Sequence, residues 1–131
     1  MKWTPDLSVG IEKIDGQHQE MFKMAEQLFS ADNAAKGAGF FEELLGFLDE
    51  YTKKHFADEE AYMESIGYPG LAQQQHDHAE FLCKLVMLKE DFEQSGKCVD
   101  VILKTNRLVL GWLKGHISCA DKKIGEYARA L

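Results

Sequence analysis

Six ionisable side chains stand at positions where helical spacing would otherwise place apolar residues. They are four histidines and two carboxylates: His18, His55, Glu59, His78, His116 and Asp121. A buried imidazole or carboxylate without a partner costs several kcal/mol, so such groups in a core are paired or bind metal. Imidazole and carboxylate ligands without a thiolate suit iron, manganese or zinc. Because one ion could not use all six groups, we predict two metal ions bridged by carboxylates.

The spacing of these residues within each segment supports a shared site. His55 and Glu59 are four residues apart, as are Gln74 and His78, so each pair lies on one face of a helix. A single histidine on an apolar face is more often a hydrogen-bonded core residue, and a structural bundle without metal is the alternative. The joint occurrence of one histidine on each of four apolar stripes favours metal binding. His76 would face solvent, because it is two residues from His78.

The apolar stripes that carry these groups predict four helices. Apolar residues recur at i, i+3, i+4 and i+7 along four segments, and neither of the two prolines interrupts one. The expected helices cover residues 18–29, 41–66, 71–92 and 99–117. The tail from Asp121 onward would add one further short helix.

Four amphipathic helices with short connections predict an all-α fold, an up-down-up-down antiparallel four-helix bundle. The stripes of such a bundle converge on one axis, where sites of imidazole and carboxylate ligands are built. Residues 1–15 do not follow the helical period, so we expect an extended N-terminal arm with Trp3 and Leu7 packed on the bundle. The length of 131 residues predicts a single domain over 1–131.

Composition and charge narrow the classes of partner. The formal charge is −7, from 22 acidic and 15 basic residues, which disfavours nucleic acid and anionic membranes as partners. No apolar run approaches the ~20 residues of a membrane span, and no secretory signal is readable. The three cysteines, Cys83, Cys98 and Cys119, form neither a disulfide framework nor a CxxC metal site. We therefore expect a cytoplasmic protein.

At the level of motifs, the sequence resembles the hemerythrins, in particular the single-domain bacteriohemerythrins. The resemblance covers almost the whole chain and combines an entry segment, an HxxxE helix, a third-helix histidine and an HxxxxD helix. The matching residues are Ile14-Asp15-Gly16-Gln17-His18, His55-Phe56-Ala57-Asp58-Glu59-Glu60, Tyr68-Pro69 with His78 and Phe81, and Trp112-Leu113 with His116-Ile117 and Asp121.

This resemblance implies a non-haem centre of two iron ions with an oxo or hydroxo bridge. The implied ligands are His18 and His55 for one iron, His78 and His116 for the other, and Glu59 and Asp121 as bridges. Dioxygen would bind end-on at an open position of one iron. Leu113 and Ile117 would wall the oxygen pocket, where an apolar lining excludes water and protons.

One position departs from the family pattern, which usually has HxxxH on the third helix. Counting back four residues from His78 gives Gln74. Either Gln74 binds weakly through its amide oxygen, or the position is open to water or another ligand, or a local shift recruits His76. The helical period argues against the last arrangement, because residues two apart lie ~200° apart around a helix.

The glutamine leaves two functions in competition. The first, which the motifs as a whole favour, is a protein that binds dioxygen for storage, delivery or sensing. The second is a di-iron redox enzyme that acts on peroxide, oxygen or nitric oxide with an unidentified redox partner. Incomplete ligation at position 74 favours the second function.

The spacing of the last two ligand candidates needs an irregular helix. His116 and Asp121 are five residues apart, and such residues lie ~140° apart around a regular helix. Either the helix ends or bulges between them, or Asp121 reaches back. A π-bulge would suit the position, since π-bulges occur often at functional sites.

Overall fold

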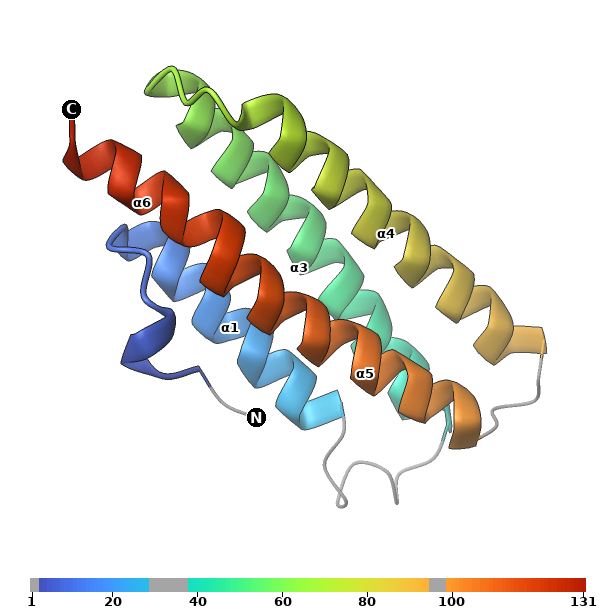
Figure 1. Ribbon diagram of the computed structural model, residues 1–131. Helices are drawn as coiled ribbons and strands as arrows, with labels where there is room; N and C mark the ends of the chain where they lie inside the picture. Colours follow the sequence, from blue (N-terminus) through green and yellow to red (C-terminus); the bar gives the residue numbers. More distant parts are fainter. Residues whose placement is uncertain (1–2, 29–37, 95–98) are drawn as a thin grey trace.

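In the part of the chain that the structure describes, the helices form four rods that pack side by side around one core (Figure 1). The computed structural model describes residues 3–28, 38–94 and 99–131. The rods are α1 (Glu12–Leu28), α3 (Ala38–Ser65), α4 (Leu71–Gln94) and a last rod of α5 (Val99–His116), the π-helical segment η2 (Ile117–Asp121) and α6 (Lys122–Arg129). Both α1 and α4 pack against α3 and α5, and the described ranges contain no strand. The predicted all-α, antiparallel four-helix bundle is confirmed.

The turn between α3 and α4 is built by a glycine in the left-handed region. Gly67 has φ +64°, which costs glycine little because it has no Cβ. The backbone N–H of Tyr68 donates to the carbonyl of Met63 at 2.9 Å, and that of Gly67 donates to Glu64 at 3.1 Å. These bonds satisfy the last carbonyls of α3 and turn the chain toward α4.

The N-terminal arm is shorter than predicted and is not fully extended. Helix α1 begins at Glu12 rather than near His18. Buried Ile14 extends its apolar stripe by one turn, which the neighbouring Lys13 and Gly16 obscure in the sequence. A 3-10 turn, η1 (Pro5–Leu7), interrupts the arm. The predicted packing of Trp3 and Leu7 against the core is found in the structure.

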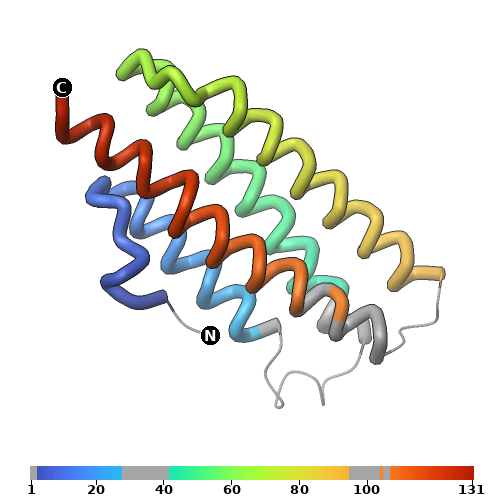
Figure 2. The backbone as a smooth tube through the Cα atoms, viewed as in Figure 1, coloured from blue at the N-terminus to red at the C-terminus, as the bar shows by residue number. Residues whose placement is uncertain are grey.

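The N-terminal arm contacts both α1 and α6, and Figure 2 shows its path beside the bundle. The carboxylate of Asp15 accepts hydrogen bonds from the hydroxyl of Ser8 at 2.5 Å and the backbone N–H of Val9 at 2.8 Å. On the other side, Val9 lies so close to Gly125 of α6 that a Cβ there would fall 1.7 Å from the Val9 carbonyl oxygen. The absence of a side chain at position 125 lets the arm and α6 touch.

The interior of the bundle combines an apolar core with an unusual number of polar groups. Large apolar residues such as Phe22, Phe81, Phe92 and Leu85 are buried. Ten further buried residues of the described ranges are polar or charged: Gln17, His18, Asp49, Thr52, His55, Glu59, Gln74, His78, His116 and Asp121. Buried polar groups require partners, so these residues are candidates for a functional site within the core.

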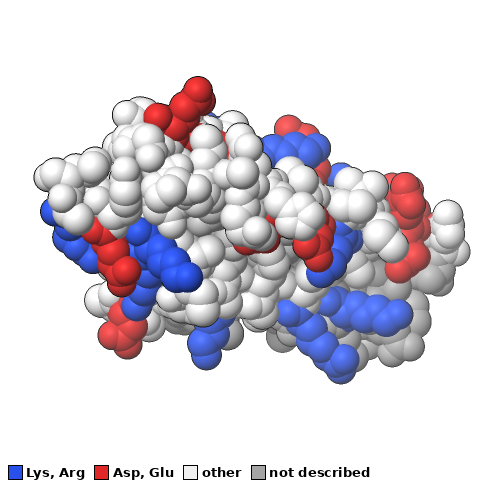
Figure 3. Space-filling model, turned by 45° about the horizontal axis from the view of Figure 1, so that its top comes forward, with Lys and Arg blue, Asp and Glu red and all other residues white. Residues whose placement is uncertain are grey.

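The outer surface carries charges of both signs. Figure 3 shows acidic and basic side chains interspersed on one face of the bundle. Among the described helices, none is both long and apolar enough to cross a membrane. Cys83 and Cys119 are exposed free thiols. Phe29, the last residue of the first predicted helix, and Cys98 lie outside the described residues.

Candidate metal centre

The six predicted site residues come together in the interior of the bundle. His18 comes from α1, His55 and Glu59 from α3, His78 from α4, His116 from the end of α5 and Asp121 from the end of η2. None of these side chains is more than 5% exposed. Because every rod contributes at least one of them, the cluster forms only when the bundle is assembled.

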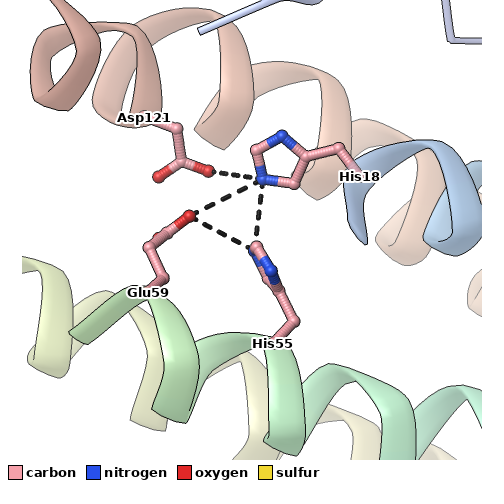
Figure 4. Close-up of side chains that lie close together, drawn as sticks. All are labelled: His18, His55, Glu59 and Asp121. Atoms are coloured by element: carbon pink, nitrogen blue, oxygen red, sulfur yellow. Dashed lines mark hydrogen bonds and ion pairs between the residues drawn. The ribbon is translucent and has the colours of Figure 1, made fainter. Parts of the chain in front are cut away.

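One half of the cluster joins α1, α3 and η2 (Figure 4). The Nε2 atom of His18 lies 3.1 Å from Nε2 of His55 and 3.1 Å from Oδ2 of Asp121. Oε2 of Glu59 lies 3.2 Å from Nε2 of His55 and 3.7 Å from Nε2 of His18. An octahedral ion with ligands about 2.1 Å away would hold neighbouring ligands about 3.0 Å apart. The four groups therefore have the spacing of ligands around one ion.

The other half uses the second oxygen of each carboxylate. Oε1 of Glu59 lies 3.2 Å from Nε2 of His78, and Oδ1 of Asp121 lies 3.1 Å from Nε2 of His116. These four residues form a second potential metal group that shares both carboxylates with the first. Each carboxylate thus presents one oxygen to each group, which is the arrangement of a bridge between two ions.

Unpaired buried atoms show that the donors fit metal ions. Both oxygens of Glu59, Oδ2 of Asp121 and Nε2 of His78 and His116 are buried and make no hydrogen bond. Leaving a buried polar group unsatisfied costs about 1–3 kcal/mol. Two divalent cations between the groups would satisfy all of these atoms, and nitrogen and oxygen donors suit iron, manganese or zinc.

Two of the histidines are held so that Nε2 faces the cluster. Nδ1 of His55 lies 2.7 Å from Oε1 of Gln17, and Nδ1 of His78 lies 2.8 Å from Oε2 of Glu60. Since Nδ1–H is the donor in both bonds, the lone pair of each ring is at Nε2. Metal-binding histidines are commonly oriented in this way.

The carboxylates and imidazoles change each other's proton affinity. Burial favours a higher pKa for Glu59, but the neighbouring imidazoles of His18, His55 and His78 hold that pKa well below its usual value. Burial lowers the pKa of His18, yet Asp121 and Glu59 outweigh it and raise that pKa to about 9. The pKa of His78 is also raised, because Glu59 and Glu60 outweigh its burial. The two buried carboxylates therefore favour the binding of cations within the cluster, either protons on the imidazoles or metal ions.

Comparison with known proteins identifies the family. The family model described as "Hemerythrin HHE cation binding domain" matches residues 9–128. The chain belongs to the hemerythrin family. It is 32% identical to a bacteriohemerythrin of Stenotrophomonas maltophilia over 98% of this chain and 81% of that protein. It is 34% identical to a bacteriohemerythrin of Pseudomonas aeruginosa over 91% and 75% of the two chains. It is 29% identical to a myohemerythrin of Riftia pachyptila over 92% and 88%.

In this hemerythrin-family chain, Gln74 faces the cluster and His76 does not. Gln74 is buried, and its Nε2 donates to Oδ1 of Asp121 at 3.1 Å. Its Oε1 is buried without a hydrogen-bond partner. The side chain of His76 is 71% exposed and pairs with Glu80 across one helical turn. Helix α4 therefore keeps the regular register that brings position 74, not 76, to His78.

The π-helical segment η2 resolves the spacing of His116 and Asp121. Residues Ile117–Asp121 form π-type turns with i→i+5 hydrogen bonds. A wider turn returns the fifth residue to nearly the same face, and Nε2 of His116 consequently lies 3.1 Å from Oδ1 of Asp121. Of the arrangements considered from sequence, the chain uses the bulge.

Aromatic rings lie against the histidines of the second group. Phe56 stacks on His78 with ring centres 3.8 Å apart, and Trp112 stacks on His116 at 4.2 Å. These contacts fix the planes of the His78 and His116 rings. Leu113 and Ile117 are both buried in the apolar core, and their role as the wall of an oxygen pocket stays a prediction.

The sequence did not predict the contacts of two residues that orient the histidines, Gln17 and Glu60. Gln17 was noted only as part of the entry motif. Nothing in the sequence indicates that it contacts His55, which is 38 residues away. Glu60 likewise stood only within the HxxxE motif, and its contact with His78 on α4 depends on how α3 and α4 pack. The adjacency of Gln17 to His18 was the one signal available.

Proposed function

We propose that this hemerythrin-family chain is a non-haem di-iron protein that binds dioxygen, end-on to one iron, for storage, delivery or sensing. The observation that carries the proposal is the sharing of both carboxylates between two donor groups. A single metal ion would need only one of these groups. The family match and the relatives named bacteriohemerythrin and myohemerythrin support iron as the metal.

The proposed ligands divide between the two ions as the donor groups do. One iron would take His18 and His55, the other would take His78 and His116, and Glu59 and Asp121 would bridge them. When bound, a pair of ferrous ions supplies two electrons to dioxygen. The chain provides buried nitrogen and oxygen donors, aromatic rings stacked on His78 and His116, and the apolar side chains of Leu113 and Ile117 as a proposed pocket wall that excludes water.

A second candidate function, a di-iron redox enzyme, is favoured by the contacts of Gln74. Its amide nitrogen bonds to Asp121, and its carbonyl oxygen has no hydrogen-bond partner. An amide is a weaker donor than the imidazole usual at this position, so the nearby ion would be more open to other ligands. Such a site would turn over peroxide, oxygen or nitric oxide with an external reductant rather than hold a stable adduct.

Oxygen cycling of the iron-loaded protein separates the two functions. The protein is reduced without oxygen, exposed to oxygen and purged, while its visible absorption spectrum is recorded. A charge-transfer band that forms with oxygen and vanishes on purging supports reversible binding. Immediate and irreversible conversion to the ferric form supports the redox enzyme. Failure of the wild-type chain to retain two iron ions contradicts both functions, and His55→Ala serves as the control that lacks one ligand.

A further inference from the structure

We propose that Glu60 and Gln17 make the two metal positions chemically unequal, with the ion beside His78 held more firmly in its ferric state. The position of His18 and His55 would then accept the first electron when the centre is reduced. The inference rests on the proposed di-iron function, and it assigns separate positioning roles to two residues outside the ligand set.

The two supported histidines have acceptors of different charge. Nδ1 of His78 meets a carboxylate oxygen of Glu60 at 2.8 Å, whereas Nδ1 of His55 meets the amide oxygen of Gln17 at 2.7 Å. The distances are nearly equal, so the chemical difference lies in the acceptor. Hydrogen bonds to an ionised acceptor are roughly twice as strong as those between neutral groups. The ring of His78 is therefore polarised more strongly toward the metal than the ring of His55.

The negative charge of Asp58, which lies behind Gln17, does not remove the difference between the acceptors of His78 and His55. Nε2 of Gln17 donates to Oδ2 of Asp58 at 2.8 Å, so a carboxylate acts on His55 only through the amide. The same oxygen of Asp58 lies 3.9 Å from Nζ of Lys13, which offsets its negative charge. The carboxylate of Glu60 touches its histidine directly.

The surroundings of His18 point in the same direction. Nδ1 of His18 is buried and has no hydrogen-bond partner among the residues that the structure describes. The position of His18 and His55 thus receives one neutral acceptor for two rings. Gln74, which faces the other position, is a weaker ligand than an imidazole, but it is uncharged like the imidazole, so the difference in charge between the acceptors Glu60 and Gln17 remains.

An electron-rich imidazole stabilises the more highly charged ion. A carboxylate acceptor on the outer ring nitrogen raises the basicity of a metal-bound histidine, and its loss typically costs 10–100-fold in metal affinity. The effect should be larger for Fe(III) than for Fe(II), because the charge on the ion is larger. Glu60 therefore lowers the reduction potential of the iron beside His78, and Gln17 has a weaker effect on the other iron.

Stepwise metal binding to four variants tests the two assignments. Metal-free protein is titrated anaerobically with Co(II), and the visible absorption of the bound ion is followed through both binding steps. Glu60→Gln keeps the volume and removes the charge, and Gln17→Leu removes the amide acceptor. The matched controls are Glu64→Gln, an exposed residue one turn further along α3, and Gln19→Leu, an exposed residue of α1.

The expected result is that each variant weakens a different step. Glu60→Gln should lower one affinity 10–100-fold, Gln17→Leu should lower the other, and the two controls should change neither. If Gln17→Leu fails to fold, Glu60→Gln carries the test alone, because its change is isosteric. Equal weakening of both steps by Glu60→Gln, or an effect no larger than that of Glu64→Gln, overturns the inference.

A potential measured on the iron-loaded protein completes the test. In wild-type protein the two irons should reduce in separate steps, and Glu60→Gln should raise the lower potential. Each tenfold loss of ferric relative to ferrous affinity corresponds to about 59 mV. Movement of both potentials by the same amount would overturn the inference while leaving a di-iron protein. Binding of fewer than two ions by wild-type chain would instead overturn the proposed function on which it rests.

Discussion

Nε2 of Gln74 lies 3.1 Å from Oδ1 of Asp121, and this bond links α4 to the π-helical segment η2. The same Asp121 oxygen lies 3.1 Å from Nε2 of His116. The amide thus contacts a proposed bridging carboxylate at the side of the second ion. Its buried carbonyl oxygen makes no hydrogen bond, so this oxygen is available as a further metal ligand on that side of the cluster.

Replacing Gln74 by histidine should tighten the second metal position. An imidazole is a better ligand for iron than an amide, so Gln74→His is expected to slow both the loss of iron and autoxidation. Iron retained against a chelator and the rate of conversion to the ferric form are the measurements. The control is Gln75→His, which adds a histidine on the exposed side of α4. Faster iron loss in Gln74→His than in wild-type protein would contradict the assignment of position 74.

Removal of individual histidines tests which of them hold metal. His55→Ala should lose most of the bound metal, because it deletes a donor of the first group and opens a buried cavity. His76→Ala should retain the wild-type amount, since that side chain is 71% exposed and pairs with Glu80. Metal content per chain is measured after gel filtration. Equal losses from the two variants would show that the register assigned to α3 or α4 is wrong.

The sequence predicted the parts of this site that depend on spacing within one helix. The pair His55 and Glu59 lies one turn apart, and its position on the inner face follows from the apolar residues around it. Convergence of the four stripes followed from the bundle itself, since the inner faces of all four helices meet. The π-bulge was foreseen as one of several solutions to the gap before Asp121.

The parts that depend on contacts between helices could not be predicted. The hydrogen bond between Gln17 and His55 depends on the relative shift and rotation of α1 and α3. A single polar residue in the sequence does not indicate either quantity. The contact of Glu60 with His78 requires the same information for α3 and α4. The early start of α1 was missed for a local reason, because the buried Ile14 stands between polar or small neighbours.

Substitution of Gly125 should separate the N-terminal arm from the bundle. A Cβ at this position would lie 1.7 Å from the carbonyl oxygen of Val9, so backbone must move to admit it. Gly125→Ala is expected to lower the free energy of unfolding by at least the ~1–3 kcal/mol typical of overpacking. The measurement is urea unfolding followed by circular dichroism.

Gly111→Ala provides the matched control for this substitution. A Cβ at position 111 of α5 would meet nothing within 4 Å. Alanine is better than glycine within a helix by roughly 0.5–1 kcal/mol, so this variant should be more stable than wild type. Equal effects of the two substitutions would mean that the arm does not pack on α6 as described.

Metal-free protein should lose stability as the pH rises from about 6.5 to 9. Burial lowers the pKa of His18, but Asp121 and Glu59 raise it from 6.5 to about 9. The stabilisation by its proton is complete below the unfolded pKa of 6.5 and disappears as the pH passes the folded pKa. It amounts to about 3 kcal/mol at most. Urea unfolding between pH 6 and 10 measures it.

At acid pH, the stability of the metal-free protein should instead rise with increasing pH. Burial favours a raised pKa for Glu59, but three histidines hold that pKa well below 4.5. Its contribution to stability is present above pH 4.5 and is lost as the pH falls through the folded pKa.

Bound metal replaces the protons on the imidazoles, so the metal-loaded protein should keep its stability between pH 6.5 and 9. A metal-free protein whose stability stays constant or rises across that window would show that His18 is not held in its protonated form by Asp121 and Glu59.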